Sequence, residues 1–276
     1  MEGMELSIVI VSYNTKLLLQ RCLESLGGEK KSNEREIIVV DNASTDGSQQ
    51  MLEEKFPLVK LIKNAENVGF AKAVNKGVSL SEGGSILLLN SDTEAKENTL
   101  VVLLEFKKKV RPAIIGLKML NPDGSVQSSV FRLPTIKKAF AEYWLGEKGS
   151  FSKYQPEGER NQEVEAVSGG AMLISREVID KIGLLDERYF MYFEDLDYCR
   201  RARKAGFKIY YLPSAKVVHE HGASGKLMAS QETQWRRLIP SSKIYYGAIK
   251  HFMINFVIWS GQKINRLFAR VSNEKN

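Results

Sequence analysis

The sequence predicts an α/β fold, in which a mostly parallel sheet is flanked by helices within a single domain. Three observations predict it. The chain has 276 residues with 43% apolar content, its first half alternates short β-branched runs with helical patterns, and no internal repeat is visible. This length suits one large α/β domain, and the composition is that of a globular protein with a sizeable core. Strands that alternate with short helices are typical of βαβ crossovers in a parallel sheet.

The predicted strands of the first half are short and apolar. SIVIVSYN at 7–14 is a continuous run, as expected of a strand buried on both faces, and a helix with one apolar stripe follows at 15–26. IIVVDN at 37–42 is the second strand, and Pro57 ends the helix after it. Further along, we expect a strand at about 59–63, a helix at about 69–80 and a strand at 86–89.

The second half is less regular. Residues 113–130 should form a hairpin around the turn Asn121-Pro-Asp-Gly124. After an apolar segment at 167–175, we expect a helix at about 194–205 and a strand at about 208–212. Right-handed crossovers would place the carboxyl ends of the parallel strands along one edge, where open α/β sheets bind ligands.

The net charge of +7 is concentrated near the C-terminal end. Residues 201–276 carry 14 basic and 3 acidic side chains, whereas residues 1–100 carry 11 and 15. This excess favours a phosphate-bearing ligand or an anionic membrane surface, although a solvated basic surface would look the same. Nucleic acid is disfavoured because no helix-turn-helix, zinc finger or aromatic RNA-binding signature accompanies the charge.

Signals for export or membrane insertion are weak. The first ten residues carry acids and run directly into a strand, so we expect no cleaved leader, and no stretch reaches the roughly 18–20 apolar residues of a membrane span. Cys22 and Cys199 are far apart in helix-like segments, which predicts a reducing, cytoplasmic compartment rather than a disulfide framework. Residues 241–276 form a predicted basic amphipathic helical extension of the domain at 1–240. That extension could lie on the inner face of a membrane, pack on the domain or form a dimer.

Three of the predicted strands end in polar residues. The first ends in Ser12, Tyr13 and Asn14, the second in Asp41 and Asn42, and the fourth in Asn90, Ser91 and Asp92. No G-x-G-x-x-G or P-loop motif occurs. Such residues are common in turns, but three endings on one edge are expected to line a site. Tyr13 could stack on a pyrimidine whose N3–H donates to the Asp41 carboxylate. The alternatives are a packing tyrosine and a turn carboxylate.

Four motifs, SIVIVSYN, IIVVDNASTDGS, ENVGFAKAVNKG and LLLNSDTE, occur in an order and spacing that resembles glycosyltransferase family 2, the inverting nucleotide-sugar enzymes of GT-A (Rossmann-like) fold. The stretch SGGAMLISREVIDKIGLLDERYFMYFEDLDYCRRARKAGFKIYYLPSAKVVHEHGAS at 168–224 resembles the rhamnosyltransferase-type branch. The resemblance covers roughly residues 5–240. It implies sugar transfer from a dTDP- or UDP-sugar, dTDP-rhamnose among them, to a hydroxyl of a glycan or lipid-linked acceptor in cell-surface polysaccharide synthesis.

The resemblance also implies how donor and metal are bound. Asn90-Ser91-Asp92 is similar to the family's Asp-x-Asp signature with its first acid replaced by Asn. Mg²⁺ or Mn²⁺ held by Asp92 would neutralise the diphosphate leaving group. His219 matches a position where some relatives supply a histidine ligand, which favours Mn²⁺, and the H-x-x-G-x-S register selects it over His221. The implied nucleotide-binding residues are Ser12, Tyr13, Asp41, Asn67, Gly69 and Asp92.

An inverting transfer also needs a base for the proton of the acceptor hydroxyl. Glu194 and Asp195 begin a helix-like run behind the aromatic stretch 189–193, where shielding would raise carboxylate basicity. The resemblance implies that Asp195 is the base, while Glu194, Gly169 and Gly170 would line the donor or acceptor pocket. On spacing alone, these acids would instead complement a helix N-terminus.

Two other function classes stay open from the sequence. A sugar-nucleotide pyrophosphorylase also uses a nucleotide-binding α/β sheet, but it should carry a glycine-rich basic loop where SYNTK stands. A non-catalytic nucleotide- or carbohydrate-binding protein would explain Asn90, whereas retention of Asp92, Asp195 and His219 argues for catalysis.

Overall fold

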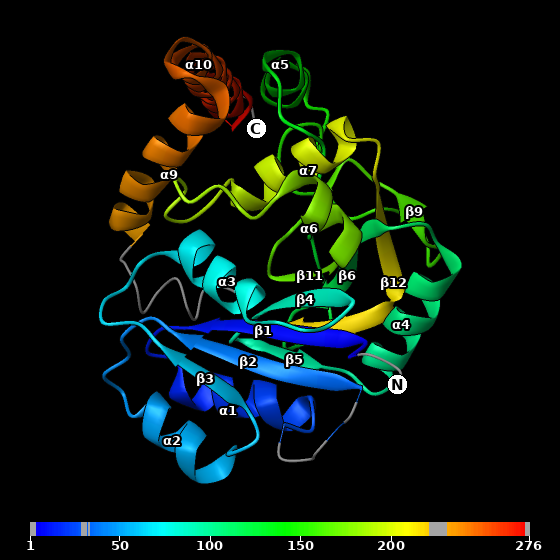
Figure 1. Ribbon diagram of the computed structural model, residues 1–276. Helices are drawn as coiled ribbons and strands as arrows, with labels where there is room; N and C mark the ends of the chain where they lie inside the picture. Colours follow the sequence, from blue (N-terminus) through cyan, green and yellow to red (C-terminus); the bar gives the residue numbers. More distant parts are fainter. Residues whose placement is uncertain (1–3, 29–31, 33, 221–230, 274–276) are drawn as a thin grey trace.

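A ten-stranded mixed sheet runs through the middle of the molecule, with helices on both of its faces (Figure 1). The computed structural model describes residues 4–28, 32, 34–220 and 231–273. The strand order is β3-β2-β1-β4-β11-β6-β12-β5, with β7 beside β6 and β9 beside β12, and β8 pairs with β10 in a separate ribbon. The predicted α/β class is therefore confirmed.

The elements follow one another along the chain as strands and helices with these bounds. The strands are β1 (Leu6–Ser12), β2 (Arg35–Asp41), β3 (Lys60–Lys63), β4 (Ser85–Asn90), β5 (Thr93–Ala95), β6 (Ala113–Leu120), β7 (Val126–Gln127), β8 (Val130–Phe131), β9 (Gln162–Glu163), β10 (Ala166–Val167), β11 (Ala171–Ser175) and β12 (Lys208–His219). The helices are α1 (Lys16–Ser25), α2 (Ser48–Lys55), α3 (Phe70–Ser79), α4 (Thr99–Lys109), α5 (Ile136–Leu145), α6 (Arg176–Ile182), α7 (Glu194–Lys204), α9 (Gln231–Tyr246) and α10 (Ala248–Asn273).

The first four strands are parallel and reverse their order beside β1. The chain moves outward from β1 to β2 and β3, then crosses back through α3 to place β4 on the other side of β1. Open α/β sheets bind ligands next to the carboxyl ends of strands at such a reversal. Ser12, Asp41 and Asn90 end β1, β2 and β4 at this edge, as the sequence predicted.

Successive residues of each central strand supply two separate cores, because side chains alternate between the faces of a sheet. Ile8 and Ile10 of β1 pack with α1, α2 and α4, whereas Val9 packs with α3, α6 and α7. Figure 1 shows α1 and α2 below the sheet and α3, α6 and α7 above it. Both layers hold the carboxyl edge rigidly in place.

The second half of the sheet is mainly antiparallel. β11 lies between β4 and β6 in antiparallel pairings, and the predicted hairpin is confirmed by the pairing of Met119 with Gln127 across β6 and β7. β12 is longer than its predicted five residues. It continues past an irregularity between Leu212 and Lys216 to His219, which pairs with Thr93 of β5.

The C-terminal tail forms two helices that pack on the domain. Tyr245 of α9 is buried, and the Arg200 guanidinium lies 4.0 Å from its ring centroid. Trp144 of α5 donates from Nε1 to the backbone oxygen of Val257 in α10 at 3.1 Å. The boundary proposed at residue 240 falls inside α9. Within the described part of the chain, no helix is long and apolar enough to cross a membrane.

Candidate functional site

A chain of buried hydroxyl groups joins the ends of β1 and β4. Ser12 Oγ lies 2.9 Å from Thr15 Oγ1, which donates to Ser91 Oγ at 2.9 Å, and all three residues are almost completely buried. Because the Ser12 hydroxyl belongs to this row of hydrogen-bonded groups, it stabilises the buried base of the site. Tyr13, the next residue, is partly exposed at the same edge, so its ring is accessible to a ligand.

Asp41, at the end of β2, accepts hydrogen bonds from the described residues with only one of its two carboxylate oxygens. Its Oδ2 accepts hydrogen bonds from the Ser44 amide at 2.9 Å and from Gln49 Nε2 at 2.7 Å, which is the turn role considered for it. Its Oδ1 is buried and accepts no hydrogen bond from the described residues. A buried acceptor without a donor is costly, so Oδ1 is suited to an N–H donor from a ligand such as a pyrimidine.

The loop before α3 is fastened to β2 by amide side chains. Asn42 Nδ2 donates to Asn67 Oδ1 at 3.4 Å and to the Gly69 oxygen at 3.3 Å, and Asn67 Oδ1 also accepts from the Gly69 amide at 3.0 Å. Gly69 has φ +87°, and a Cβ at this position would lie 2.6 Å from the Phe190 oxygen. Only glycine therefore lets the aromatic segment that precedes α7 approach this edge.

Asp92, in the turn between β4 and β5, lies next to His219 at the end of β12. The distance from Asp92 Oδ1 to His219 Nε2 is 3.3 Å, and the Glu220 amide donates to the backbone oxygen of Asp92 at 3.0 Å. The antiparallel pairing of His219 with Thr93 sets this approach. Asn90 Nδ2 lies 3.4 Å from the same Nε2, so Asn90 belongs to this cluster even though it is not an acid. His221 lies outside the described residues.

The pair of Asp92 and His219 fits a divalent cation that takes its remaining ligands from elsewhere. A carboxylate oxygen and an imidazole nitrogen suit Mn²⁺, and Mg²⁺ accepts the carboxylate. Both side chains are nearly buried. Within the described residues no group of three or more His, Cys, Asp or Glu side chains could hold a metal. A metal here would therefore also need oxygen ligands from a diphosphate and water.

Glu194 and Asp195 open α7 with unlike environments. Asp195 is partly exposed, and its Oδ2 accepts a hydrogen bond from the Gly169 amide at 3.1 Å. Burial raises the pKa of Glu194 to about 8, and the charge of Asp195 contributes to the same rise. Glu194 is therefore protonated at neutral pH, and this avoids a buried negative charge beside a second carboxylate. Gly170, which follows Gly169 in the sequence, lies against Asn90. Gly169 and Gly170 therefore connect Glu194 and Asp195 to the cluster around Asp92.

The segment before α7 is strained. Tyr192 and Phe193 have φ of 71° and 69°, a left-handed conformation that costs non-glycine residues energy and that clusters at functional sites.

Asp197, also in α7, has different neighbours from Asp195. It forms ion pairs with Arg200 at 2.6 Å and Arg201 at 2.8 Å, so it stabilises the helix.

Sequence reasoning did not identify Thr15 or Gln127. Gln127 Oε1 lies 2.6 Å from His219 Nδ1, although the two are 92 positions apart in the chain. Only the strand pairing reveals this contact. Asn42 was expected at the end of the second strand, and the structure adds its contacts with Asn67 and Gly69.

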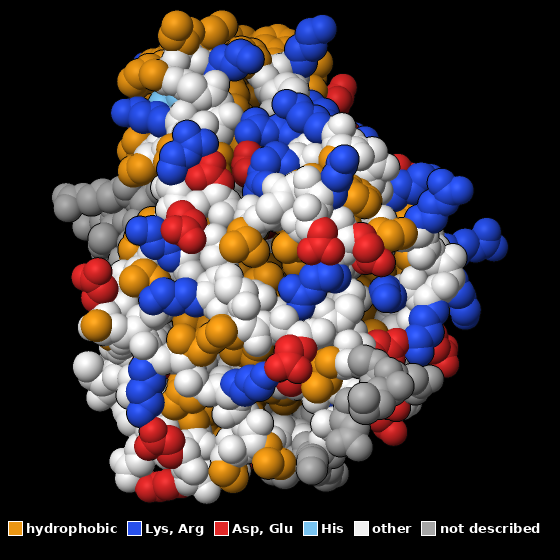
Figure 2. Space-filling view, viewed as in Figure 1, with side chains coloured by type: hydrophobic (Ala, Val, Ile, Leu, Met, Phe, Trp, Pro, Cys, Tyr) orange, Lys and Arg blue, Asp and Glu red, His pale blue; other side chains and the backbone are white. Residues whose placement is uncertain are grey.

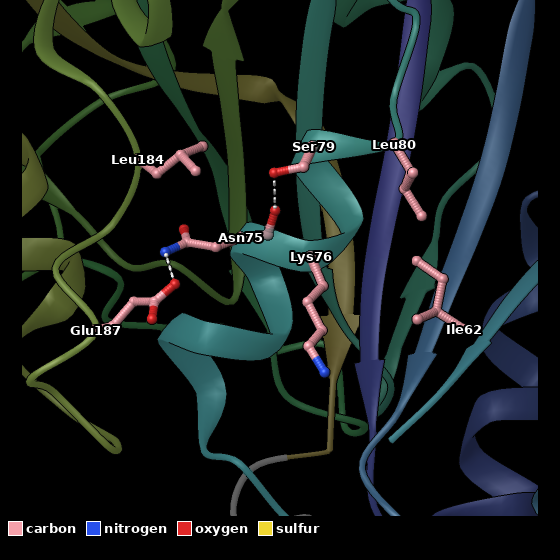
Figure 3. A pocket seen from close by; sticks show the side chains of 7 residues that line it. All are labelled: Ile62, Asn75, Lys76, Ser79, Leu80, Leu184 and Glu187. Carbon is pink, nitrogen blue, oxygen red and sulfur yellow. Dashed lines mark hydrogen bonds between the residues drawn. The ribbon is translucent and has the colours of Figure 1, made fainter. Parts of the chain in front are cut away.

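A hollow of about 330 Å³ lies beside the second half of α3 (Figure 3). Asn75 Nδ2 donates to the Leu185 oxygen at 2.9 Å and to Glu187 Oε1 at 3.0 Å. Polar groups that line the hollow therefore already bind one another. Because α3 begins at the carboxyl edge and runs away from it, this hollow is not part of the site. Its lining residues are Ile62, Asn75, Lys76, Ser79, Leu80, Leu184 and Glu187.

Known proteins resemble the chain in sequence and in fold. Its residues 7–183 match the family described as Glycosyl transferase family 2. The N-acetylglucosaminyl-diphospho-decaprenol L-rhamnosyltransferase of Mycobacterium tuberculosis is 30% identical over 239 residues, which cover 79% of this chain and 77% of that protein. The dTDP-rhamnosyl transferase RfbF of Shigella flexneri is 27% identical over 217 residues, covering 78% and 68%. The mannosyltransferase PcManGT from Pyrobaculum calidifontis, solved with GDP-Man and Mn²⁺, shares 14% identity and a TM-score of 0.60, over 98% of this chain and 76% of its own.

The sheet and its flanking helices have the GT-A fold, which the solved mannosyltransferase shares. With its sequence match over residues 7–183, the chain belongs to glycosyltransferase family 2 and is similar to the rhamnosyltransferases of that family. The resemblance stated from the motifs is confirmed. The pyrophosphorylase interpretation is correspondingly disfavoured.

Proposed function

We propose that the chain transfers a sugar, with inversion, from a dTDP- or UDP-sugar to a hydroxyl of a glycan or lipid-linked acceptor. The observation that carries the proposal is one edge of one sheet that presents Asp41, the Asp92–His219 pair and Asp195 together. The names of the mycobacterial and Shigella relatives support dTDP-rhamnose as the donor and a diphospho-lipid-linked glycan as the acceptor. Such chemistry belongs to cell-surface polysaccharide synthesis.

The donor nucleotide would lie between β1 and the loop before α3. Tyr13 is accessible for stacking, and the buried Asp41 Oδ1 is placed to accept from the N3–H of uracil or thymine. Asn67 and Gly69 would shape the opposite wall. Ser12 contributes through its buried link to Thr15 rather than through an exposed hydroxyl.

Mn²⁺ or Mg²⁺ would be held by Asp92 and His219, and when bound it would supply positive charge for the departing diphosphate. The Mn²⁺ in the solved mannosyltransferase PcManGT supports this assignment. Asp92 Oδ1 and His219 Nε2 lie 3.3 Å apart, and Asn90 Nδ2 lies 3.4 Å from the same nitrogen. The role of Asp92 and His219 themselves is to orient the diphosphate.

Asp195 would take the proton of the acceptor hydroxyl as its oxygen attacks the anomeric carbon. The Gly169 amide fixes one carboxylate oxygen by its hydrogen bond at 3.1 Å. Glu194 stays protonated beside it, because burial raises the Glu194 pKa to about 8. The proposal therefore assigns the base to Asp195 rather than to Glu194.

The C-terminal tail at 241–276, an extension of the domain at 1–240, would contact an anionic membrane surface on the cytoplasmic side. Apolar side chains of α5 and α10 gather at one end of the molecule with Lys and Arg around them (Figure 2). The exposed fractions reach 78% for Ile249, 62% for Phe252 and 64% for Phe256. Residues 241–273 contain no acid, as expected of a surface that binds anionic lipid. The buried free thiols of Cys22 and Cys199 are consistent with a reducing compartment.

Transfer to a diphospho-lipid-linked N-acetylglucosamine acceptor from dTDP-rhamnose, UDP-glucose, UDP-galactose and UDP-N-acetylglucosamine, with and without Mn²⁺, tests the proposal. We expect turnover with one donor, dependence on the metal, and loss of metal-dependent nucleoside diphosphate binding in Asp92→Ala. Asp92 lies at a strand end, so its removal should leave the thermal unfolding temperature nearly unchanged. Nucleotide-sugar binding without any transfer or donor hydrolysis would favour the non-catalytic interpretation. Unchanged metal-dependent affinity in Asp92→Ala would overturn the metal assignment.

Vesicle sedimentation tests the tail. Phe252→Ser with Phe256→Ser should weaken binding to phosphatidylglycerol-containing vesicles at low salt, while Leu58→Ser with Leu80→Ser is the control for loss of exposed apolar area elsewhere. Leu58 and Leu80 are 53% and 58% exposed. Equal vesicle binding by both double variants would dismiss the membrane contact. A shift of the wild-type chain to dimers, abolished by the tail variant, would assign the face to self-association.

A further inference from the structure

The hairpin of β6 and β7 places a chain of hydrogen-bonded side chains against His219. His219 Nδ1 lies 2.6 Å from Gln127 Oε1, and Gln127 Nε2 donates to Asn121 Oδ1 at 3.0 Å. Asn121 Nδ2 donates to Ser125 Oγ at 2.9 Å, and Ser125 Oγ donates to Asp123 Oδ1 at 2.6 Å. None of these four residues has a role in the proposed function so far.

The direction of every bond follows from the carboxylate at the end of the chain. An ionised carboxylate only accepts hydrogen bonds, so Ser125 must give Asp123 its single hydroxyl hydrogen and must itself accept from the Asn121 amide group. Hydrogen bonds from Ser125 hold the pKa of Asp123 below its usual value, which keeps that carboxylate ionised at neutral pH. The carbonyl oxygen of Asn121 then faces Gln127.

The same logic carries through Gln127 to the imidazole. Gln127 gives its NH₂ to Asn121, so its carbonyl oxygen faces His219, and an oxygen at 2.6 Å requires a hydrogen on Nδ1. A neutral imidazole with its hydrogen on Nδ1 has its lone pair on Nε2. That nitrogen is the one 3.3 Å from Asp92 Oδ1.

We propose that Gln127 is a positioning residue that fixes His219 in the Nδ1–H tautomer and so directs the Nε2 lone pair towards the site of the divalent cation. The inference rests on the metal site of the proposed function. A histidine that binds a metal usually donates its other N–H to a fixed acceptor, and removal of that acceptor lowers metal affinity about 10–100-fold. Here β7, which is far from His219 in the sequence, supplies the acceptor.

Strand register and burial make the contact rigid. Gln127 pairs with Met119, which pairs with Val217 of β12, so the three strands hold Gln127 beside the end of β12. Gln127 Nε2 also lies 3.5 Å from the backbone oxygen of His219. His219 is 8% exposed, which leaves little room for water to replace the Gln127 oxygen.

Long-range ¹H–¹⁵N NMR correlations of the histidine rings, recorded without metal at neutral pH, read the tautomer directly. The chain has three histidines, so His221→Gln and His251→Gln variants assign the His219 signals. We expect the Nδ1–H tautomer in the wild type and in Gln127→Glu, which keeps an acceptor oxygen. Gln127→Leu removes the acceptor, so Nε2–H, which can donate to Asp92, should become the main form. Val126→Ala, an exposed neighbour on β7, is the control and should match the wild type.

Binding of Mn²⁺ alone, followed by electron paramagnetic resonance of the free ion, supplies the second measurement. Gln127→Leu should weaken Mn²⁺ binding about 10–100-fold, while Gln127→Glu and Val126→Ala stay within a few-fold of the wild type. An Nε2–H tautomer in the wild type, or a tautomer and affinity unchanged in Gln127→Leu, would overturn the inference. Wild-type protein that shows the Nδ1–H tautomer but binds no Mn²⁺ would instead overturn the metal site of the proposed function.

Discussion

The two halves of the carboxyl edge are built differently. At the ends of β1 and β2, polar side chains bind one another, as Ser12 does with Thr15 and Asn42 with Asn67. At the start of α7, Glu194 is buried with a raised pKa. Left-handed backbone occurs in both halves, after β1 and β2 as well as before α7. Polar side chains that hold one another suit the binding of a ligand of fixed shape, whereas perturbed acids are typical of sites of chemistry. The difference supports the proposed binding role of the first half and the proposed proton transfer in the second.

The largest effect is expected at Asp195. Asp195→Asn keeps the shape of the side chain but cannot take the acceptor's proton, so turnover should fall about 10²–10⁴-fold with donor affinity nearly unchanged. Steady-state transfer kinetics measure this fall. Near-normal turnover would move the base to another acid of α7 and would remove the basis of the comparison.

Asp41→Asn should act on binding instead. The variant can still accept from the Ser44 amide, but it presents an NH₂ group where Asp41 Oδ1 is buried without a donor. Loss of one such acceptor costs about 1–3 kcal/mol, so affinity for the nucleoside diphosphate should fall roughly 5- to 150-fold. Calorimetric titration measures the affinity. An unchanged affinity would leave Asp41 as a turn carboxylate only.

Asp197→Asn tests whether the acids of α7 are interchangeable. Asp197 pairs with Arg200 and Arg201, whose side chains are 31% and 29% exposed, so the loss should be smaller than for a fully buried pair. We expect the free energy of unfolding in urea to fall by about 1–3 kcal/mol, while turnover of the folded enzyme stays within a few-fold. A large loss of turnover at unchanged stability would contradict this division of roles.

Glu194→Gln gives the smallest effect at neutral pH, because glutamine resembles the protonated acid. The native pKa of about 8 lies above the ordinary 4.5, so the folded state holds a proton that the unfolded state releases. The stability of the wild type relative to the variant should therefore decline as pH rises from about 4.5 through about 8. Urea unfolding at several pH values measures the difference. A difference independent of pH would show that Glu194 is ionised in the folded protein.

Local patterns in the sequence predicted the parallel half of the fold well. Apolar runs such as 37–42 and turn residues such as Pro57 are local signals, and they correspond to β2 and to the end of α2. The full length of β12 was not predicted, because its second part lies beyond an irregularity and Pro213. The resemblance of the motifs indicated Asp92 and His219, and in the structure Asp92 Oδ1 lies 3.3 Å from His219 Nε2. Gln127 was missed because its contact with His219 depends on strand register, which no local pattern encodes.

A paired measurement on Asp41→Asn and Asp195→Asn tests the division between binding and chemistry most directly. Each variant is titrated with the nucleoside diphosphate and assayed for transfer at saturating donor. We predict opposite results: Asp41→Asn loses affinity but regains most of its turnover when donor saturates, and Asp195→Asn keeps its affinity but loses turnover at every donor concentration. If both variants lost affinity and turnover in the same proportion, the two halves of the edge would act as one unit, and the account would be contradicted.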